Sequence, residues 1–462
     1  MTTPTTTRTK SATTGVSTLT VQTIAWSLLL LVFVVGSYAK LDGFMPLTGQ
    51  PSPVLAVWIG DALVFVALLA ATLRQSKLKA VWRAEPFDYA LAAWCIISVV
   101  WLVIGLQRQV AHPNPYAYAL YGGGPLGPFQ FFINQAAAFA AYYLARGFGQ
   151  RKPSLEAPAL AIEIVAAAVG LLCALEACVT QRPIRLEASF TNPNLLSSFL
   201  VLTIPLIAAR ALSREGGRTA TGVRVALIAG LILALVFTKS RGGEIGLLIA
   251  FAVIGLAMLR RTAQWIRYGR GLAAIAAILV VATIMAALVF KHSLGSAQSH
   301  LAGDMGRVST WKASYKLFTK QPVFGTGLGG YPGALRDLGL SQPLEVSPGK
   351  LINIPLVHVH AHDLFLNVAA ERGSVGLCLL IVSLVLVGKR WLAVVTRPGF
   401  SPVQLGAAGA LAGWFIQNFA DFTLWYPAIA MVVFVEIGLI MSPNGTPGEV
   451  NEAEKSSVKQ AS

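Results

Sequence analysis

The feature that most constrains this chain is a series of long apolar runs. Crossing a hydrocarbon core of about 30 Å takes roughly 20 apolar residues in a helix. Runs of that length recur from near residue 20 to near residue 441. Charged residues make up 12% of the 462 residues and hydrophobic residues 55%, whereas a soluble domain carries about 25% charged residues. The sequence therefore predicts an all-α integral membrane protein.

These runs predict about twelve transmembrane helices. They are expected near residues 20–39, 53–73, 88–106, 129–145, 158–178, 194–210, 223–238, 243–259, 271–290, 374–388, 403–419 and 425–441. The predicted organisation is a disordered tail over 1–18, helices one to nine over 19–290, a polar loop over 291–373, helices ten to twelve over 374–441, and a disordered tail over 442–462.

Basic residues give an independent test of this layout. The net charge of +16 is concentrated in short clusters between apolar runs, a distribution typical of cytoplasmic loops. The clusters follow alternate predicted helices, at 74–83, 146–152, 210–218, 260–270 and 389–397. Both termini are therefore predicted to be cytoplasmic, with the loop 291–373 on the outer side of the membrane. The same distribution argues against nucleic-acid binding, for which no recognition motif is present.

Arg241 departs from this pattern because it lies on the side where basic residues are sparse. It follows a short polar corner between two apolar helices. At the start of a helix, free N–H groups and the helix dipole favour an anion, and a guanidinium suits phosphate oxygens. An interfacial arginine that reaches the lipid headgroups would give the same pattern. Both interpretations remain open at this point.

Arg307 is the second isolated arginine, near the start of the long polar loop. After it, Trp311, Tyr315 and Phe318 recur at helical spacing, which predicts an amphipathic helix lying along the membrane surface. The glycine-rich segment 322–330 lacks the Lys-Ser/Thr of a phosphate-binding loop. We interpret that segment as closely packed backbone.

Three of the six histidines lie together, as His358, His360 and His362. If the segment is extended, alternate spacing presents all three on one side, as in a metal-ligand face; if it is helical, they point in different directions. Zinc binding, general-base catalysis and a polar loop are all compatible with the cluster. We predict no metal, because convergent cysteine or acidic spacing is lacking. His362 is the preferred base, because a helix is expected to begin immediately after it.

The histidine segment also carries a recognisable spacing. His362-Asp363, nine further residues and Gly373-Ser374-Val375-Gly376 follow one another. This run resembles the signature of the O-antigen ligase and polymerase superfamily, in which a histidine followed by Asn, Ser or Gln precedes Gly-x-x-Gly at the same spacing. Asp363 departs from that signature.

Three other stretches resemble the same family. Ser240-Arg241-Gly242 is similar to the family's arginine at the outer end of a central helix. Arg307 with Trp311 is similar to the Arg-x-x-x-Trp that opens its long periplasmic loop. The stretch from Phe190 to Asn194 resembles a segment before an apolar helix. The likeness extends over about residues 187–441.

The resemblance implies a GT-C-like membrane glycosyltransferase with a large periplasmic loop containing short helices. Such enzymes need no metal or other cofactor and take a glycan from an undecaprenyl pyrophosphate donor. The resemblance implies catalytic roles for His362, Arg241 and Arg307, with both arginines on the pyrophosphate. The other residues expected to contact substrate are His360, His358, Asn194 and Trp311.

Several acceptors fit this chemistry. Our first choice is an inverting O-antigen ligase of the bacterial inner membrane, which transfers the glycan to the lipid A core among the membrane lipids. An O-antigen or exopolysaccharide polymerase and a protein O-oligosaccharyltransferase are alternatives of the same chemical class. A membrane transporter is an alternative of another class. Transport would require ionisable residues near the membrane midplane, for which Asp61, Glu163 and Glu176 are the candidates.

Overall fold

The computed structural model describes residues 22–31, 84–111, 127–147, 155–179, 185–190, 192–213, 216–260, 297–347, 350–356, 358, 360–397 and 399–442. Within these residues the regular structure is helical apart from one two-stranded hairpin. The predicted helices over 53–73 and 271–290, and the two predicted tails, lie outside the described residues.

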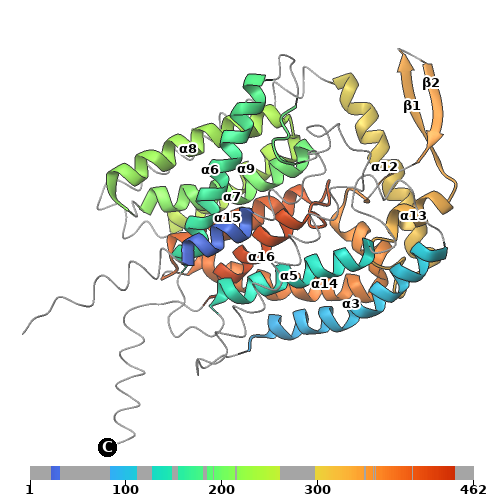
Figure 1. Cartoon of the computed structure of the whole chain (residues 1–462), viewed down its shortest axis with the longest axis horizontal. Coiled ribbons are helices and arrows are strands. Elements are labelled where there is room, and N and C mark those ends of the chain that lie inside the picture. Colours follow the sequence, from blue (N-terminus) through green and yellow to red (C-terminus); the bar gives the residue numbers. More distant parts are fainter. Residues whose placement is uncertain are drawn as a thin grey trace, which may run out of the picture.

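The helical architecture agrees with the apolar runs. The bundle helices are α3 (Pro86–Ala111), α5 (Gly127–Arg146), α6 (Glu156–Val179), α7 (Pro193–Ser213), α8 (Gly217–Thr238), α9 (Arg241–Arg260), α14 (Leu364–Thr396), α15 (Pro402–Gln417) and α16 (Pro427–Met441) (Figure 1). A shorter apolar helix spans Gln22–Leu31. Six of the described helices (α3, α6, α7, α8, α9 and α14) are long and apolar enough to cross a membrane. The protein is therefore a multi-pass membrane protein, as predicted.

Helix α7 forms the centre of the bundle and packs against α8, α9 and α15. Nearly all of its residues from Pro193 to Ala211 are buried. Close approach of its neighbours depends on small residues, as is usual between membrane helices. A Cβ added at Gly246 of α9 would lie 2.8 Å from the carbonyl oxygen of Gly413 in α15. These contacts fix the ends of α9 and α15 relative to each other.

One end of the bundle holds arginines at the ends of α5 and α7 and beside the end of α16, and we call it the basic end. Arg146 pairs with Asp88, and Arg210 pairs with Glu156 at 2.7 Å. Arg390 donates to the carbonyl oxygens of Ile440 and Ser442, both at 2.7 Å. The described arginines of three predicted basic clusters, Arg146, Arg210 and Arg390, thus lie at one end of the bundle.

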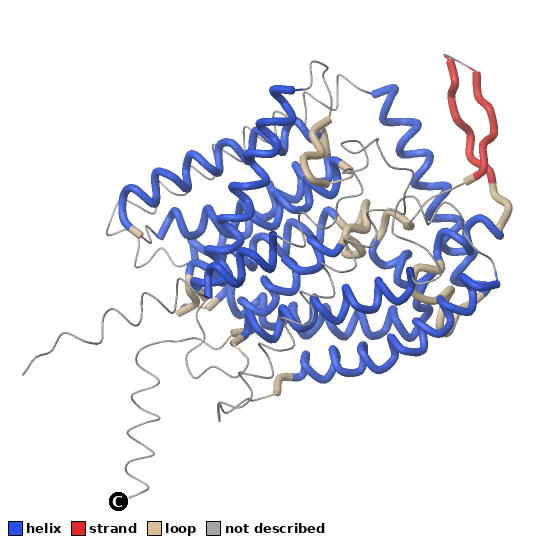
Figure 2. Tube along the Cα trace, in the orientation of Figure 1, coloured by secondary structure: helices blue, strands red, loops and turns tan. Residues whose placement is uncertain are grey.

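The long polar loop contains two helices and a hairpin. Its helices are α12 (Ala297–Lys320) and α13 (Tyr331–Asp337), and its strands are β1 (Ser341–Ser347) and β2 (Lys350–Pro355). The strands pair antiparallel from Ser341↔Pro355 to Ser347↔Lys350, and Figure 2 shows them standing clear of the helices. Short helices in the loop were predicted, but the hairpin was not. Its signal is the Pro348-Gly349 dipeptide, which favours a turn.

Helix α12 buries a different face from the predicted aromatic one. Its buried residues are Thr310, Ala313, Ser314 and Leu317, spaced i, i+3, i+4 and i+7, whereas Tyr315 is 60% exposed. Small side chains let α12 pack against α14. The aromatic face was predicted to lie along the membrane surface, and that placement stays a prediction.

The glycine-rich segment 322–330 is closely packed backbone, as predicted. A Cβ at Gly325 would overlap the backbone of Glu371 in α14, and a Cβ at Gly327 would overlap the backbone of Gly105 in α3. On the other side, Gly373 interrupts α14 with φ 64° and ψ −163°, a conformation open mainly to glycine. The segment therefore joins α3 to the kink of α14.

Candidate active site

The histidine segment ends in a tight turn before α14. His362 has φ 53°, in the left-handed region that few non-glycine residues adopt. Asp363 is the N-cap of α14, and its carboxylate accepts a hydrogen bond of 2.7 Å from the Leu366 N–H. Asp363 stands where the family signature has Asn, Ser or Gln. Because Asn, Asp and Ser are all good N-caps, aspartate at this position still starts the helix. The predicted start of this helix is confirmed.

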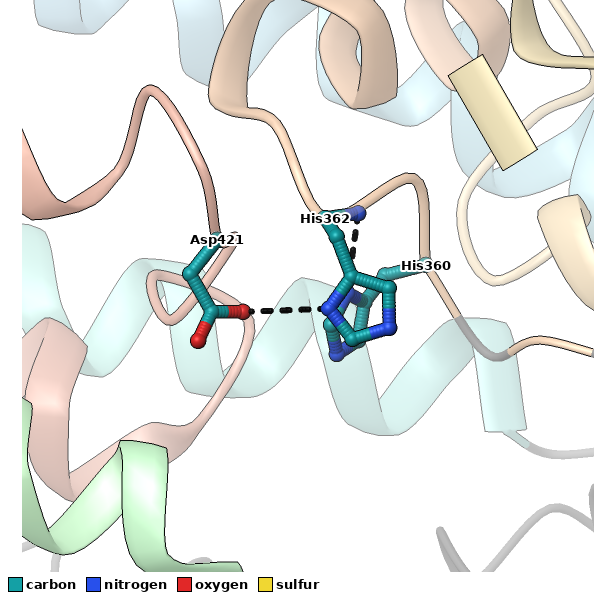
Figure 3. A group of neighbouring side chains, drawn as sticks. All are labelled: His360, His362 and Asp421. Atoms are coloured by element: carbon teal, nitrogen blue, oxygen red, sulfur yellow. Dashed lines mark hydrogen bonds and ion pairs between the residues drawn. The ribbon is translucent and has the colours of Figure 1, made fainter. Parts of the chain in front are cut away.

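His362 faces a carboxylate from another part of the chain. Its Nδ1 lies 3.3 Å from Oδ1 of Asp421, which is in the segment between α15 and α16 (Figure 3). Asp421 is 8% exposed and His362 20% exposed at their side chains. Burial alone would raise the pKa of Asp421, but the hydrogen bond from His362 and the charges of the neighbouring histidines hold it below its ordinary value. Sequence reasoning missed Asp421.

The other two histidines gather around His362. Ring centroids are 4.2 Å apart for His360 and His362, and 5.5 Å apart for His358 and His362. The His362 N–H donates to Nδ1 of His360 at 3.3 Å. His360 lies outside β2 and helix α14. His360 is therefore in neither a strand nor a helix, and the three rings lie together as they would on one side of an extended segment.

The environment separates the three imidazoles chemically. Burial, followed by the nearby His362, lowers the pKa of His360 to about 3 and that of His358 to about 4. Groups that weak are poor proton acceptors near neutral pH. His362 has a carboxylate partner in Asp421. This geometry supports His362 as the base. The sequence alone had left His358 and His360 as alternatives.

The same side chains could also hold a cation. One ligand atom each from His360, His362 and Asp421 lie within 4.8 Å of one another. The 3.3 Å between His362 and Asp421 suits a hydrogen bond and also suits two ligands of one zinc ion. The expectation that no metal is needed therefore stays a prediction.

Arg241 begins α9, as predicted. Helix α8 ends at Thr238, and Lys239 turns the chain with φ 52°. Ser240 precedes the helix, and its hydroxyl accepts from Ser197 at 3.0 Å. A Cβ at Gly242 would lie 3.4 Å from the Gln417 side chain at the end of α15. Arg241 therefore lies at the end of the bundle where α15 finishes.

Arg185 is a further cation at this end, which sequence reasoning missed. Its Nε donates to the carbonyl oxygen of Thr238 at 2.8 Å, and its Nη2 donates to Oδ1 of Asn194 at 3.2 Å. Burial lowers the pKa of Arg185, Glu187 opposes that change, and the positive charge of Arg307 adds to it. Arg185 and Arg307 are thus close enough to interact electrostatically.

Hydrogen bonds tie these segments into one site, at what we call the histidine end. Trp311 Nε1 donates to the His362 carbonyl oxygen at 3.3 Å, and Leu364 N donates to the Asn418 carbonyl oxygen at 3.0 Å. Gln417 Nε2 donates to the Asn194 carbonyl oxygen at 3.3 Å. Arg307, one helical turn before Trp311, is close enough to act on the pKa of His360. The predicted site residues therefore meet at one end of the bundle.

A cavity of about 560 Å³ begins at His360. The described residues that line it come from α3, α5, α9, α13, α14, α15 and α16 and from the loops between them, and most are apolar. Along α14 the lining extends from Leu364 to Trp391. The histidine end therefore continues into a deep apolar space within the bundle.

The candidate transport residues have other roles where they are described. Glu163 pairs with Arg210 and Arg224. Glu176 accepts hydrogen bonds from the N–H groups of Glu187 and Ala188. Asp61 lies outside the described residues. Neither described carboxylate lines the cavity.

Fold and site define a multi-pass membrane protein with a histidine–carboxylate pair and several arginines at one end of its bundle. Residues 226–381, about a third of the chain, match the family model described as O-antigen ligase. The matched stretch contains Arg241, Arg307 and His362. The family comprises glycan-transferring membrane enzymes of the ligase and polymerase type, which use lipid-linked glycans. No curated protein matches the chain.

Proposed function

We propose that the protein is an O-antigen ligase of the bacterial inner membrane, with both termini in the cytoplasm and its site at the periplasmic face. It would transfer a glycan from undecaprenyl pyrophosphate to a sugar hydroxyl of the lipid A core. The observation that carries this proposal is the His362–Asp421 pair, located where the family's arginines also lie. The family match over 226–381 supports the same reaction class.

His362 supplies the base in this proposal. A sugar hydroxyl has a pKa far above neutrality and must lose its proton as it attacks. With Nδ1–H donated to Asp421, a tautomer assigned from the 3.3 Å contact, Nε2 keeps a lone pair for that proton. Asp421 also stabilises the imidazolium that forms. Asp421 is therefore a positioning residue, and His362 is the proton acceptor.

The reaction is a single displacement at the anomeric carbon. The acceptor oxygen forms its new bond as the bond to the pyrophosphate oxygen breaks, and the acceptor proton passes to Nε2 of His362. Undecaprenyl pyrophosphate leaves with the electron pair, and the anomeric centre is inverted. The proton later returns to solvent.

Arginines stabilise the leaving group. Negative charge grows on the pyrophosphate as the bond breaks, and preorganised cations are most effective against charge that develops in the transition state. Arg241 and Arg307 fill this role by the family resemblance, since guanidiniums bind phosphate oxygens in bidentate fashion. Arg185 adds a third positive charge beside Arg307.

A polymerase and a protein O-oligosaccharyltransferase would use the same base and the same arginines, and differ in the acceptor. Transport is less well supported, because both described candidate carboxylates have structural partners. Glu163 forms ion pairs with Arg210 and Arg224, and Glu176 accepts backbone hydrogen bonds.

Lipopolysaccharide from a strain lacking this protein tests the proposal. We expect loss of the O-antigen ladder, accumulation of lipid-linked glycan, and recovery with the wild-type chain. Lipopolysaccharide carrying one repeat unit would instead indicate a polymerase. An unchanged ladder, with a glycoprotein lost, would indicate the protein-glycosylating branch.

A further inference from the structure

Helix α15 ends in two adjacent amide side chains, Gln417 and Asn418, that the proposed mechanism does not use. Gln417 is 2% exposed and Asn418 is fully buried. An amide removed from water costs free energy unless new hydrogen bonds replace those it loses, so the partners of a buried amide indicate its role. These two amides have different partners, and each set of partners belongs to a different half of the candidate active site.

Gln417 connects α15 to the start of α9. Its Nε2 donates a hydrogen bond of 3.0 Å to Oγ of Ser197, and Ser197 Oγ donates one of 3.0 Å to Oγ of Ser240. Ser240 immediately precedes Arg241. On the other side of Arg241, a Cβ at Gly242 would lie 3.4 Å from the Gln417 side chain. Gln417 is therefore linked to both chain neighbours of Arg241.

Asn418 connects the same helix end to the His362–Asp421 pair. Its backbone carbonyl accepts a hydrogen bond of 3.0 Å from the N–H of Leu364, two residues after His362. Its Oδ1 accepts from the N–H and the hydroxyl of Thr423, at 2.8 and 3.2 Å, two residues after Asp421. Its Nδ2 donates to a carbonyl oxygen of α15 at 2.8 Å. Asn418 is thus fixed on its own helix and holds the backbone beside both members of the pair.

The two amides connect parts of the chain that are distant in sequence. Asn194, the other acceptor of Gln417 Nε2, is 223 residues away from it. Because Gln417 and Asn418 are consecutive, covalent geometry fixes the distance between their backbones. The start of α9 and the His362–Asp421 pair are therefore held relative to each other through one point, the end of α15.

The proposed reaction depends on this spacing. The base must reach the acceptor hydroxyl on one side of the anomeric carbon, while Arg241 contacts the leaving pyrophosphate on the other. A displacement of about 1 Å from such a geometry can lower a rate about a hundredfold. A tie between the two halves of the site therefore contributes to catalysis without touching the substrate.

We propose that Gln417 and Asn418 are positioning residues for the two halves of the active site. Gln417 holds Arg241 on the pyrophosphate side. Asn418 holds the His362–Asp421 pair on the acceptor side. This inference rests on the proposed function, which assigns the pyrophosphate to Arg241 and the proton to His362. Because the two amides have separate partners, their substitutions should have different effects. Residues needed only for folding would instead lower donor binding and transfer rate together.

Binding and turnover by the purified full chain in lipid nanodiscs separate the two roles. Gln417→Met should weaken binding of undecaprenyl pyrophosphate by about tenfold. It should fold, because Gln417 Oε1 has no hydrogen-bond partner among the described residues and its removal offsets the lost donor. Asn418→Leu should bind the same probe within about twofold of wild type but transfer glycan about tenfold more slowly at saturating donor. Equal effects of the two variants on binding and on rate would overturn the proposal.

Gln404 provides a matched control on the same helix. It is a buried amide at the other end of α15, and its Nε2 donates to the carbonyl oxygens of Leu439 and Ser442. Gln404→Met should lower thermal stability but keep donor binding and the transfer rate of the folded protein within about twofold of wild type. Losses of binding or rate in this control would show that any buried amide of α15 gives the same result, and would overturn the assignment.

A histidine spectrum tests the inference without turnover. In NMR of the full chain with isotope-labelled histidine, His362→Ala identifies the signal of the His362 side chain. Asn418→Leu should shift that signal, because the Asp421 segment loses its tie to α15, whereas Gln417→Met should leave it in place. Thr423→Val removes one of the hydrogen bonds to Asn418 and should shift the same signal, which keeps the test available if Asn418→Leu does not fold.

Failure of this inference and failure of the proposed function give different results. A wild-type protein that transfers no glycan to the lipid A core would contradict the proposed function. An unmoved His362 signal in the folded variants of Asn418 and Thr423 would overturn the positioning role, whatever the protein transfers.

Discussion

Arg146 and Arg210 at the basic end of the bundle are paired with carboxylates, whereas Arg185 at the histidine end donates hydrogen bonds to neutral oxygens. At the basic end, Arg146 pairs with Asp88 and Arg210 with Glu156. At the histidine end, Arg185 bonds to a carbonyl and a side-chain amide oxygen. A neutral oxygen orients a guanidinium without cancelling its charge. We therefore expect the ion pairs of the basic end to hold helices together and the arginines of the histidine end to bind an anion.

The largest effect among the arginines should come from Arg241→Lys and Arg307→Lys. Lysine keeps the charge but loses the planar fork, so transfer should fall on the order of a hundredfold, the size found when one transition-state donor is removed. Transfer is measured with purified enzyme and lipid-linked glycan, and membrane insertion is the control. Full activity in both variants would show that these residues do not clamp the pyrophosphate.

A smaller effect is expected for Asp421→Asn. The amide keeps the size of the carboxylate but cannot stabilise an imidazolium, so the rate should fall by about tenfold or more. An unchanged rate would reduce Asp421 to a packing residue.

Sequence reasoning was sufficient where a local pattern carries the structure. Apolar length predicted the bundle helices, and the polar corner before Arg241 predicted the start of α9. It was insufficient where partners come from distant segments. Asp421 is 59 residues from His362, and Arg185 is one of two arginines in a short loop with no recognisable motif. Their roles depend on how α7, α14 and α15 pack, which periodicity does not encode.

The same limit applies to α12 and to the turn before α14. Thr310, Ala313 and Ser314 form the buried face of α12 because small residues permit close contact, and a search for large apolar residues overlooks them. A histidine on the left-handed side of φ space at position 362 likewise has no local sequence signal.

At the basic end, Glu163→Gln should leave the transfer rate of the folded protein within about twofold of wild type, since its ion-pair partners lie outside the proposed site. It should destabilise the protein by about 3 kcal/mol, because Arg210 and Arg224 would lose a shared buried carboxylate. Thermal unfolding in detergent measures the loss. A large rate defect at normal stability would contradict the division between the two ends.

The smallest effect should come from metal removal. EDTA should leave transfer unchanged, because in the proposed chemistry guanidiniums stabilise the leaving pyrophosphate, a role that a metal ion fills in other enzymes. The candidate ligands His360, His362 and Asp421 make this a real test. Activity lost to EDTA and restored by zinc would assign a metal to the histidine end.

The central claim is that His362 is the base, and single alanine substitutions of the three histidines test it most directly. His362→Ala should reduce the rate of glycan transfer on the order of a hundredfold or more, the usual size for a general base, with donor binding retained. His358→Ala and His360→Ala should cost much less, because burial leaves both imidazoles weakly basic. A His362→Ala enzyme within about threefold of wild type would contradict the account and move the base to His360.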